Sequence, residues 1–391
     1  MVRPQACSQE DLASMIALVD SIMRAGSDQS MLTDYPLVYR TANLKNVRVI
    51  KTAPAAPSQA RPNVVAVVPF IRRPMTMAGC HFSIGIISPT ATDPHHRHKG
   101  YGLACLHSCL EQMAEDDVDL SVLWTQVATF PFYEHAGYQA VRTQSTRYLC
   151  THEDAALFKD YGQAVVLYDS AAPDHLADIM LLHLQESVGV IRQVDETAAL
   201  FALPSMKTLL ALDGGRVAAY LIVSLASNKF GLIEGGGAEK GLQTLLHHAL
   251  LQWSGAQPIP IYGYLTPSVL GDLLERTLPE RREPRASNMM IRVNQVRRFL
   301  EKIRPWLAQK GRAWEDSFSV HVADTNETIA FIFSKQGLQL GAEPQAQHAV
   351  LTRQQFTAVL FGEHLARRVS VPAFVTELFP LYFPIWVLDS S

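Results

Sequence analysis

The first third of the chain switches between helical and extended spacing of its apolar residues. A helical period over residues 8–25 predicts a helix with Ser8 as its N-cap. Three runs rich in apolar residues predict strands after it, at residues 47–51, 64–70 and 81–88. The segments between them are rich in proline, glycine and serine, as turns are. The pattern therefore indicates a helix followed by a small sheet.

A second pattern follows the last of these strands. Apolar residues return at three- and four-residue steps at Leu103, Leu106, Leu110 and Met113, which predicts an amphipathic helix. The run "VDLSVLW" at residues 118–124 then predicts a buried strand. Strand, glycine-containing loop, helix and strand in this order form a βαβ-like unit.

Two further sections follow, and the first partly repeats this order. The predicted strands "TLLAL" and "RVAAYLIVSL" flank Asp213-Gly214-Gly215 as in a hairpin, and "FGLIEGGG" leads into an apolar-faced helix. The next section begins with the helix "NQVRRFLEKIRPWL", continues with two alternating strands, and closes with a helix that has a Thr352–Gln355 capping box and Gly362 as C-cap. We predict three domains, at residues 1–150, 151–287 and 288–391.

The charge balance narrows the class of partner. Lys and Arg number 34 against 37 Asp and Glu in 391 residues, a net charge of −3, so nothing favours nucleic acid or an anionic membrane. The five cysteines are odd in number and form no CxxC pair, which argues against a disulfide framework and a zinc knuckle. No apolar run approaches the length of a membrane span, and the first residues lack the apolar core of a signal peptide. We expect a soluble cytoplasmic protein with a small or acyl-carrying ligand.

The stretch "DPHHRHKGYG", residues 93–102, gathers basic side chains and glycines between a predicted strand and a predicted helix. Arg97, Gly100 and Gly102 fit the pattern R-x-x-G-x-G. Glycines let the backbone bend so that successive N–H groups converge on an anion, and the positive end of the helix favours a pyrophosphate. The dinucleotide fingerprint and Walker A motif are both absent. We predict a diphosphate-binding loop; the alternative is a solvated basic turn that caps the helix.

A metal site is the weaker interpretation of the same loop. His95, His96 and His98 do not share one side, and no Asp, Glu or Cys cluster elsewhere in the sequence supplies obvious further ligands. Cys105 and Cys109 lie one helical turn apart near the apolar face, where buried small hydrophobic residues are expected. We predict no metal.

Together, "TATDPHHRHKGYG" and "LWTQVATFPFYEHAGY" resemble the acetyl-coenzyme A motif and the C-terminal strand region of the GNAT acetyltransferase superfamily. The three-section layout resembles the enhanced intracellular survival (Eis) type, and "MLTDYP", "VGVIR" and "LFPLYFP" are similar to segments of that type. The resemblance implies an α+β fold: two tandem GNAT-like domains with mixed, mostly antiparallel sheets, and a smaller sterol-carrier-like domain. Only the first domain carries the cofactor loop.

The resemblance also assigns roles to residues. Backbone groups of Thr90, Ala91 and Thr92 would meet the pantetheine arm and the thioester carbonyl. Arg97 would support the turn of the loop. The backbone amides of the loop would wrap the pyrophosphate, from His98 through Lys99, Gly100, Tyr101 and Gly102 to Leu103. Tyr133 takes the position of the acid that protonates sulfur; the alternative is a packed aromatic residue. The role of general base is assigned to the carboxylate of Ser391, although members of the family usually end on an aromatic residue. The alternatives are that Asp389 or a water chain is the base, and that the terminus has no role.

The implied function is an acetyl-coenzyme A dependent N-acetyltransferase. A primary amine, on a small molecule or on a peptide lysine, would attack the thioester directly in a ternary complex. Acetyl-coenzyme A would be the cosubstrate, with no metal, no nucleic acid and no membrane partner, and the chain could form a homo-oligomer. The alternative is a non-catalytic protein that binds or senses acyl-coenzyme A or an apolar ligand.

Overall fold

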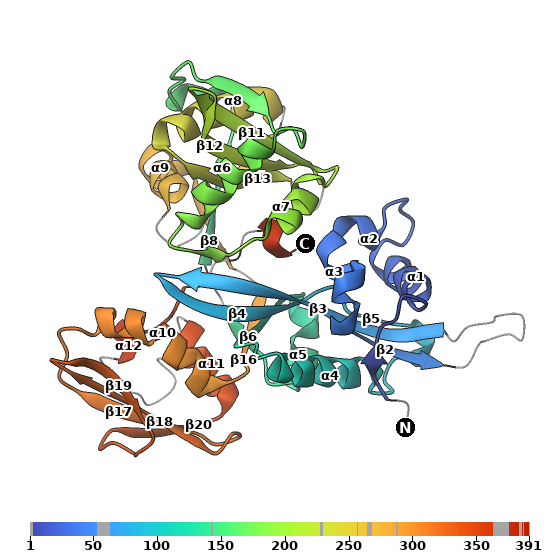
Figure 1. The fold of residues 1–391 in the computed structure, drawn as a ribbon, viewed down its shortest axis with the longest axis vertical. Helices are drawn as coiled ribbons and strands as arrows, with labels where there is room; N and C mark the ends of the chain where they lie inside the picture. The colour runs from blue at the N-terminus through green and yellow to red at the C-terminus, as the bar shows by residue number, and fades with distance from the viewer. Residues whose placement is uncertain are drawn as a thin grey trace, which may run out of the picture.

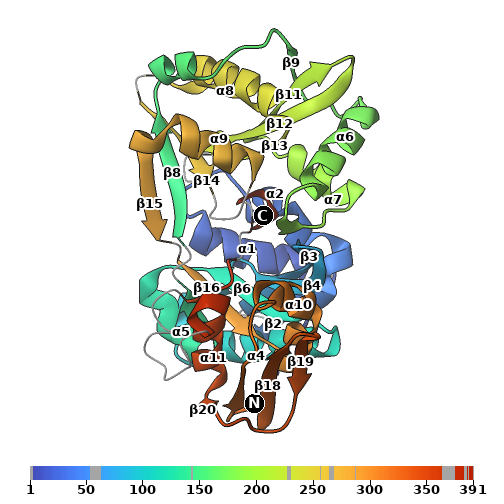
Figure 2. The same cartoon turned by 90° about the vertical axis from the view of Figure 1, so that its left-hand side faces the viewer.

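The structure is a computed structural model, and it describes residues 3–52, 63–141, 144–226, 230–255, 257–263, 268–286, 288–362, 375–382, 385 and 387–390. Three sheets organise the chain, and each is covered by helices (Figure 1). The second sheet lies apart from the first and third, which are neighbours at the other end of the molecule (Figures 1 and 2). This arrangement confirms the predicted α+β fold with mixed, mostly antiparallel sheets.

The first sheet has nine strands in the order β1-β2-β3-β4-β6-β16-β7, with β5 and β10 paired to β3. Its strands are β1 (Gln5–Ala6), β2 (Val47–Thr52), β3 (Asn63–Met77), β4 (Cys80–Ile87), β5 (Ala91–Thr92), β6 (Leu120–Trp124), β7 (Gln139–Val141), β10 (Val188–Val190) and β16 (Met289–Val293). Its helices are α1 (Leu12–Met23), α2 (Met31–Asp34), α3 (Pro36–Tyr39), α4 (Tyr101–Glu115) and α5 (Phe130–Glu134), with 3₁₀ turns η1 (Thr41–Asn46), η2 (Pro94–His96) and η3 (Val127–Thr129). The predicted strands and the helix after the loop are therefore present.

The first helix begins later than the sequence predicts. Asp11, not Ser8, is the N-cap of α1. The Ser8 N–H and hydroxyl both donate to the Asp11 carboxylate, at 3.0 and 2.7 Å. The prediction was wrong about the cap because Ser8 stabilises the turn that precedes the helix instead.

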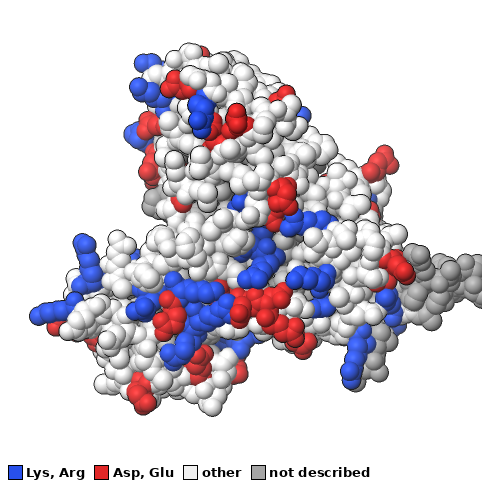
Figure 3. Space-filling view, viewed as in Figure 1, with Lys and Arg blue, Asp and Glu red and all other residues white. Residues whose placement is uncertain are grey.

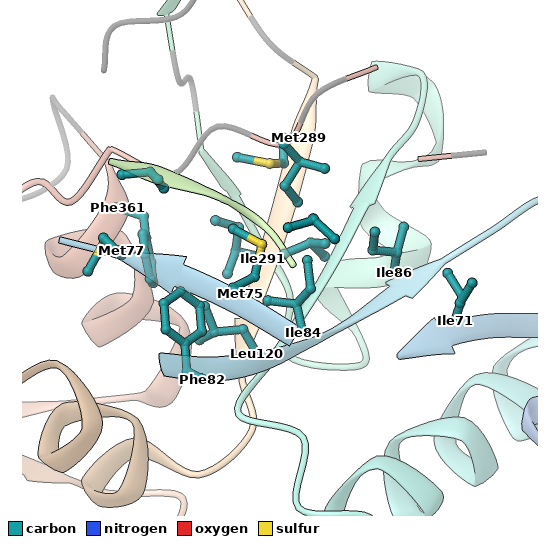
Figure 4. Close-up of a cluster of buried hydrophobic side chains, with 14 of the residues drawn as sticks. Ile71, Met75, Met77, Phe82, Ile84, Ile86, Leu120, Met289, Ile291 and Phe361 are labelled. Carbon is teal, nitrogen blue, oxygen red and sulfur yellow. The ribbon is translucent and has the colours of Figure 1, made fainter. Parts of the chain in front are cut away.

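The two faces of the first sheet are packed against different partners because side chains alternate along each strand. One face packs on α4 through Val68, Phe70 and Ile87, together with Cys105 and Cys109. The other carries the apolar cluster of Figure 4, drawn from β3, β4, β6 and β16 and joined by Phe361 of the third section. Both faces of the first sheet are thus buried.

The second sheet has seven strands in the order β15-β8-β14-β13-β12-β11-β9. They are β8 (Gln144–Cys150), β9 (Ala164–Leu167), β11 (Met206–Asp213), β12 (Arg216–Ser224), β13 (Gly231–Gly237), β14 (Ile259–Gly263) and β15 (Arg282–Ala286). The accompanying helices are α6 (Pro173–Leu184), α7 (Val194–Phe201), α8 (Glu239–Trp253) and α9 (Val269–Thr277), with the 3₁₀ turns η4 (His152–Leu157) and η5 (Pro279–Arg281). The predicted hairpin is present: Gly214 and Gly215 both have positive φ in the turn between β11 and β12.

The third sheet has four strands in the order β19-β18-β17-β20. The strands are β17 (Ser317–Val322), β18 (Glu327–Ser334), β19 (Gly337–Gly341) and β20 (His348–Leu351). Its helices are α10 (Val296–Lys310), α11 (Arg353–Phe361) and α12 (Val375–Leu378), and the chain closes with the 3₁₀ turn η7 (Val387–Ser390). The Thr352–Gln355 capping box and the Gly362 C-cap of α11 are both present.

Strands cross the predicted domain boundaries in three places. β10, from the predicted second domain, pairs with β3 in the first sheet. β8, from the predicted first domain, lies in the second sheet between β14 and β15. β16, from the predicted third domain, lies in the first sheet between β6 and β7. The second sheet and its helices are therefore inserted between β7 and β16 of the first sheet.

Candidate functional site

Two parallel strands separate at one end of the first sheet. The pairing of β4 with β6 runs from Ile84–Leu120 to Ile86–Val122. The chain after β4 then turns back to β3, where Ala91 pairs with Val67. β6 instead continues beside β16 as far as Trp124. Backbone groups at the ends of β4 and β6 therefore leave their shared ladder, and the predicted pantetheine residues Thr90, Ala91 and Thr92 follow this point.

The predicted loop connects this end of β4 to α4. The Asp93 carboxylate accepts the His95 N–H at 2.8 Å and lies 3.1 Å from His96 Nδ1. The hydrogen bonds from His96 and from the His95 amide hold the pKa of Asp93 below its usual value. Arg97 Nε donates to the Thr92 carbonyl at 3.3 Å. These contacts tie the loop back to the strand from which it leaves. Lys99 extends the exposed part of the loop.

The backbone of the loop has two left-handed residues, His98 at φ 61° and Gly100 at φ 77°. Gly100 is the N-cap of α4 and has no side chain to bond the helix N–H groups. The first turn of α4 carries no acidic residue, so the amides of Tyr101, Gly102 and Leu103 keep the positive end of the helix uncompensated. Such an arrangement suits an anion.

Gly102 allows a close approach of α4 to its neighbours. A Cβ atom there would lie 3.1 Å from Thr92 Oγ1 and 3.5 Å from the Phe132 ring. The helix N-terminus, the end of the strand and α5 therefore meet at one point. Any larger side chain at position 102 must displace Thr92 or Phe132.

Tyr133 lies on α5 at the same junction. Its hydroxyl hydrogen-bonds to Thr90, and burial raises its pKa above the ordinary phenol value. The ring packs edge-on against Phe132 and Tyr138, with centroids 4.9 and 5.9 Å away. Tyr133 is thus a packed aromatic residue, which is the alternative stated above. Its hydroxyl also contacts Thr90, one of the three residues predicted to lie beside the thioester.

The remaining predicted catalytic residue, Ser391, lies outside the described residues. Asp389, the alternative base, is described and is fully buried. Its carboxylate accepts hydrogen bonds from Arg73 at 3.1 Å and from Arg192 at 2.7 and 2.8 Å. A carboxylate enclosed in this way is poorly placed to collect a proton from an acceptor.

Sequence reasoning missed the charged residues around Asp389. Arg73 lies in β3, within the apolar run "VVPFIRRPMTM", and Glu234 lies in β13, within "FGLIEGGG". A charged residue inside an apolar strand was the available signal, because such a residue is buried only with a partner. On the visible face, acidic and basic side chains are interspersed (Figure 3), in keeping with the near-neutral net charge.

Other chemistry finds little support in the described part of the chain. No three His, Cys, Asp or Glu side chains come together there as metal ligands. All five cysteines are buried, and burial raises the pKa of Cys105 to about 12, so it is a poor nucleophile. No helix among the described residues has the length and apolarity to cross a bilayer.

The fold is that of a protein built on tandem GNAT-like units. Residues 9–141 match the family model of the GNAT acetyltransferase domain. No curated protein sequence is similar enough to be recognised as a relative.

Solved structures share the fold over nearly the full length. A probable N-acyltransferase from Enterococcus faecalis has a TM-score of 0.73 at 17% identity, covering 99% of this chain and 97% of that one. A GCN5-related N-acetyltransferase from Anabaena variabilis has a TM-score of 0.69 at 14% identity, with 98% and 99% covered. Eis1 from Mycobacterium abscessus has a TM-score of 0.61 at 13% identity, with 98% and 97% covered. The resemblance to the Eis-type architecture is confirmed for the fold.

Proposed function

We propose that this protein is an acetyl-coenzyme A dependent N-acetyltransferase that acts on a primary amine. The observation that carries the proposal is the junction of three elements: the uncapped N-terminus of α4, the end of β4 at Thr90–Thr92, and Tyr133 on α5. GNAT acetyltransferases use acetyl-coenzyme A as cosubstrate, and this junction supplies amides for its diphosphate beside a hydroxyl for its sulfur. The sterol-carrier likeness of the third section stays a prediction.

The loop binds the diphosphate in this proposal. Amides from His98 to Leu103 converge on the phosphate oxygens, and Arg97 holds the turn through the Thr92 carbonyl. The pantetheine arm then enters where β4 and β6 separate, and pairs with backbone groups that no longer serve the strand ladder. The loop reads the diphosphate and not the acyl group, so longer acyl donors would bind it equally well.

The chemistry is a direct attack. The amine nitrogen bonds to the thioester carbonyl carbon, backbone amides near Thr92 stabilise the oxyanion, and the carbon–sulfur bond breaks as the intermediate collapses. Tyr133 gives its proton to the leaving thiolate. Because burial raises the pKa of Tyr133 above the ordinary phenol value, which itself exceeds that of a thiol, the transfer is uphill.

The attacking nitrogen loses two protons in all. A base takes one from the ammonium group before attack, and the second leaves the nitrogen as the tetrahedral intermediate collapses, which balances the proton that Tyr133 gives to sulfur. The resemblance assigns this role to the carboxylate of Ser391. Asp389 supports that assignment indirectly, because it fixes the preceding turn η7 against β3, β13 and Arg192. The acceptor is a small-molecule amine or a peptide lysine.

Thiol release tests the proposal, in a panel of polyamines, aminoglycosides and lysine peptides. Tyr133→Phe should lower kcat by about 10²-fold and leave the acetyl-coenzyme A Kd within twofold, because general acid catalysis is worth at least that much. The matched control is Tyr138→Phe, which removes the neighbouring phenol that contacts Ser121 and should cost stability without that loss of kcat.

Tight binding of acetyl-coenzyme A with turnover of none of these amines would favour the non-catalytic binding protein instead. Equal kcat values for Tyr133→Phe and the parent chain would remove Tyr133 from the mechanism.

A further inference from the structure

Five charged side chains meet in the interior around the end of the chain, and we call them the tail cluster: Arg73, Arg192, Glu196, Glu234 and Asp389. Arg73 bridges Glu196 at 2.8 Å and Asp389 at 3.1 Å. Arg192 bridges Asp389 at 2.7 Å and Glu234 at 2.6 Å. The two arginines therefore hold Asp389 between them.

The cluster is buried and nearly balanced in charge. The side chains of Arg73, Glu234 and Asp389 are 0% exposed, that of Arg192 is 2% exposed and that of Glu196 is 8% exposed. Three carboxylates face two guanidiniums, and the half-buried Arg40 adds the third positive charge through Glu196 at 2.8 Å. Burial alone would raise the pKa of Glu234, but Arg192 and His183 hold it below its usual value. The partners of Glu234 thus favour its charged form.

The members come from parts of the chain that are distant in sequence. Arg73 is on β3 of the first sheet, Glu234 is on β13 of the second, and Asp389 is on η7. Figure 1 places η7 between the two sheets, beside α7, which carries Glu196. Asp389 therefore joins the tail to both GNAT-like units at once.

Buried ion pairs contribute little net stability, because desolvation offsets most of the Coulomb attraction. Buried ion pairs can instead select one arrangement of the chain. An apolar chain end could pack in several registers, whereas a carboxylate held between two guanidiniums allows only one register. The apolar residues near the chain end, such as Leu381, Ile385 and Leu388, give burial without such directionality.

The cluster is close to the junction described above. Arg73 is paired with Ile84 on β4, and Phe70 with Ile87, so the anchor lies three strand residues, or about 10 Å, from the end of β4. Arg73 shares a sheet face with Ile84, because paired residues point the same way. The two residues after Asp389 extend at most about 7 Å. They can therefore approach the region where the strands separate.

We propose that Arg73 and Arg192 form a two-armed clamp that sets the docked position of the tail through Asp389, and that all three are positioning residues for acetyl transfer. The inference rests on the proposed function for its catalytic consequence, but the clamp itself is a property of the folded chain. Loss of the clamp frees the tail and leaves the diphosphate loop intact.

Two readouts on the full chain test the clamp: hydrogen exchange of the amides at 385–390, and kinetics with an amine from the panel. Asp389→Asn should speed tail exchange at least tenfold and lower kcat at least tenfold, with the acetyl-coenzyme A Kd within twofold. Asp178→Asn is the matched control, because Asp178 is also buried and accepts from Arg216 and the Val217 N–H, away from the tail. It should lower the melting temperature and change neither readout.

The double variant Arg73→Gln with Asp389→Asn leaves the net charge of the cluster unchanged, and it replaces the single variant if that one does not fold. Unchanged tail exchange in a folded variant overturns the clamp. Faster exchange with unchanged kcat overturns the positioning role. If the parent chain acetylates no amine, the proposed function fails, and the exchange measurement alone still decides whether the clamp exists.

Discussion

The first and second sheets each contain one parallel strand pair crossed over by a helix, β4–α4–β6 and β13–α8–β14. In the first unit, residues 88–100 separate strand from helix and include two left-handed residues. In the second, Ala238 alone separates β13 from α8. The same unit of fold therefore presents its helix N-terminus in two different ways.

The second helix N-terminus already has a negative charge. Glu239 lies in the first turn of α8, where it accepts from Arg276 and Gln243, whereas the first turn of α4 has no acid. The glycines before α8 serve packing: a Cβ on Gly237 would lie 2.4 Å from the Ala218 carbonyl oxygen. Under the proposed function, the comparison implies that glycines at a strand–helix junction serve an anion only where a loop frees the helix amides.

Substitution of Gly102 in α4 and of Gly241 in α8 should give the largest difference between the two units. Gly102→Val should weaken acetyl-coenzyme A binding by about 100-fold, because it pushes Thr92 and Phe132 away from the α4 terminus. Gly241→Val should instead destabilise the fold by about 1–3 kcal/mol, since a Cβ at Gly241 would lie 2.6 Å from Ala219 Cβ. Calorimetric titration and thermal unfolding of both variants measure the contrast. Equal acetyl-coenzyme A affinities in the two variants would contradict the assignment of the loop.

The stability of the protein should depend on pH through the titration of Glu186, which lies in the second unit. Burial raises its pKa to about 7, so between pH 4.5 and 7 the folded state binds more protons than the unfolded state, and stability falls as pH rises. Glu186→Gln should therefore stabilise the protein by about 1–3 kcal/mol above pH 7 and by little near pH 4.5. Urea unfolding at the two pH values measures this.

Glu239→Gln serves as its control, since an exposed ion pair contributes little to stability. A stability gain for Glu186→Gln that is the same at both pH values would contradict the titration argument.

The smallest expected effect comes from alanine substitutions at two glycines with positive φ, which separate backbone strain from ligand binding. Gly100 and Gly215 have φ of 77° and 83°, and a Cβ atom at either position would meet no other heavy atom within 4 Å. Gly100→Ala and Gly215→Ala should therefore each cost about 1 kcal/mol of stability through backbone strain alone. Only Gly100→Ala should also raise the acetyl-coenzyme A Kd, by a few-fold, because Gly215 lies in the β11–β12 turn. Thermal unfolding and calorimetric titration measure the two effects, and a Kd shift of the same size in both variants would show that strain, and not the loop, weakens binding.

The spacing of apolar residues predicted helices and strands well where it followed a single period, either helical or extended. The helix at 101–115, the strand at 120–124 and the Gly214-Gly215 hairpin all follow from spacing and turn chemistry. The meeting of Tyr133 with Thr90 was implied only by resemblance, because no periodicity reports a contact between residues so far apart. The strand at 289–293 went unrecognised, since nothing local shows that a strand completes a sheet begun far earlier in the chain.

The sequence by itself determined the loop, the helix that follows it, the apolar faces and the near-neutral surface, because these depend on residue type and on neighbours a few positions away. Only the tertiary structure decided that the second unit is inserted into the first sheet, and that Asp389 is buried between Arg73 and Arg192. The physical reason is that burying a charge requires a partner, and the partner of each of these charges lies far away in the chain.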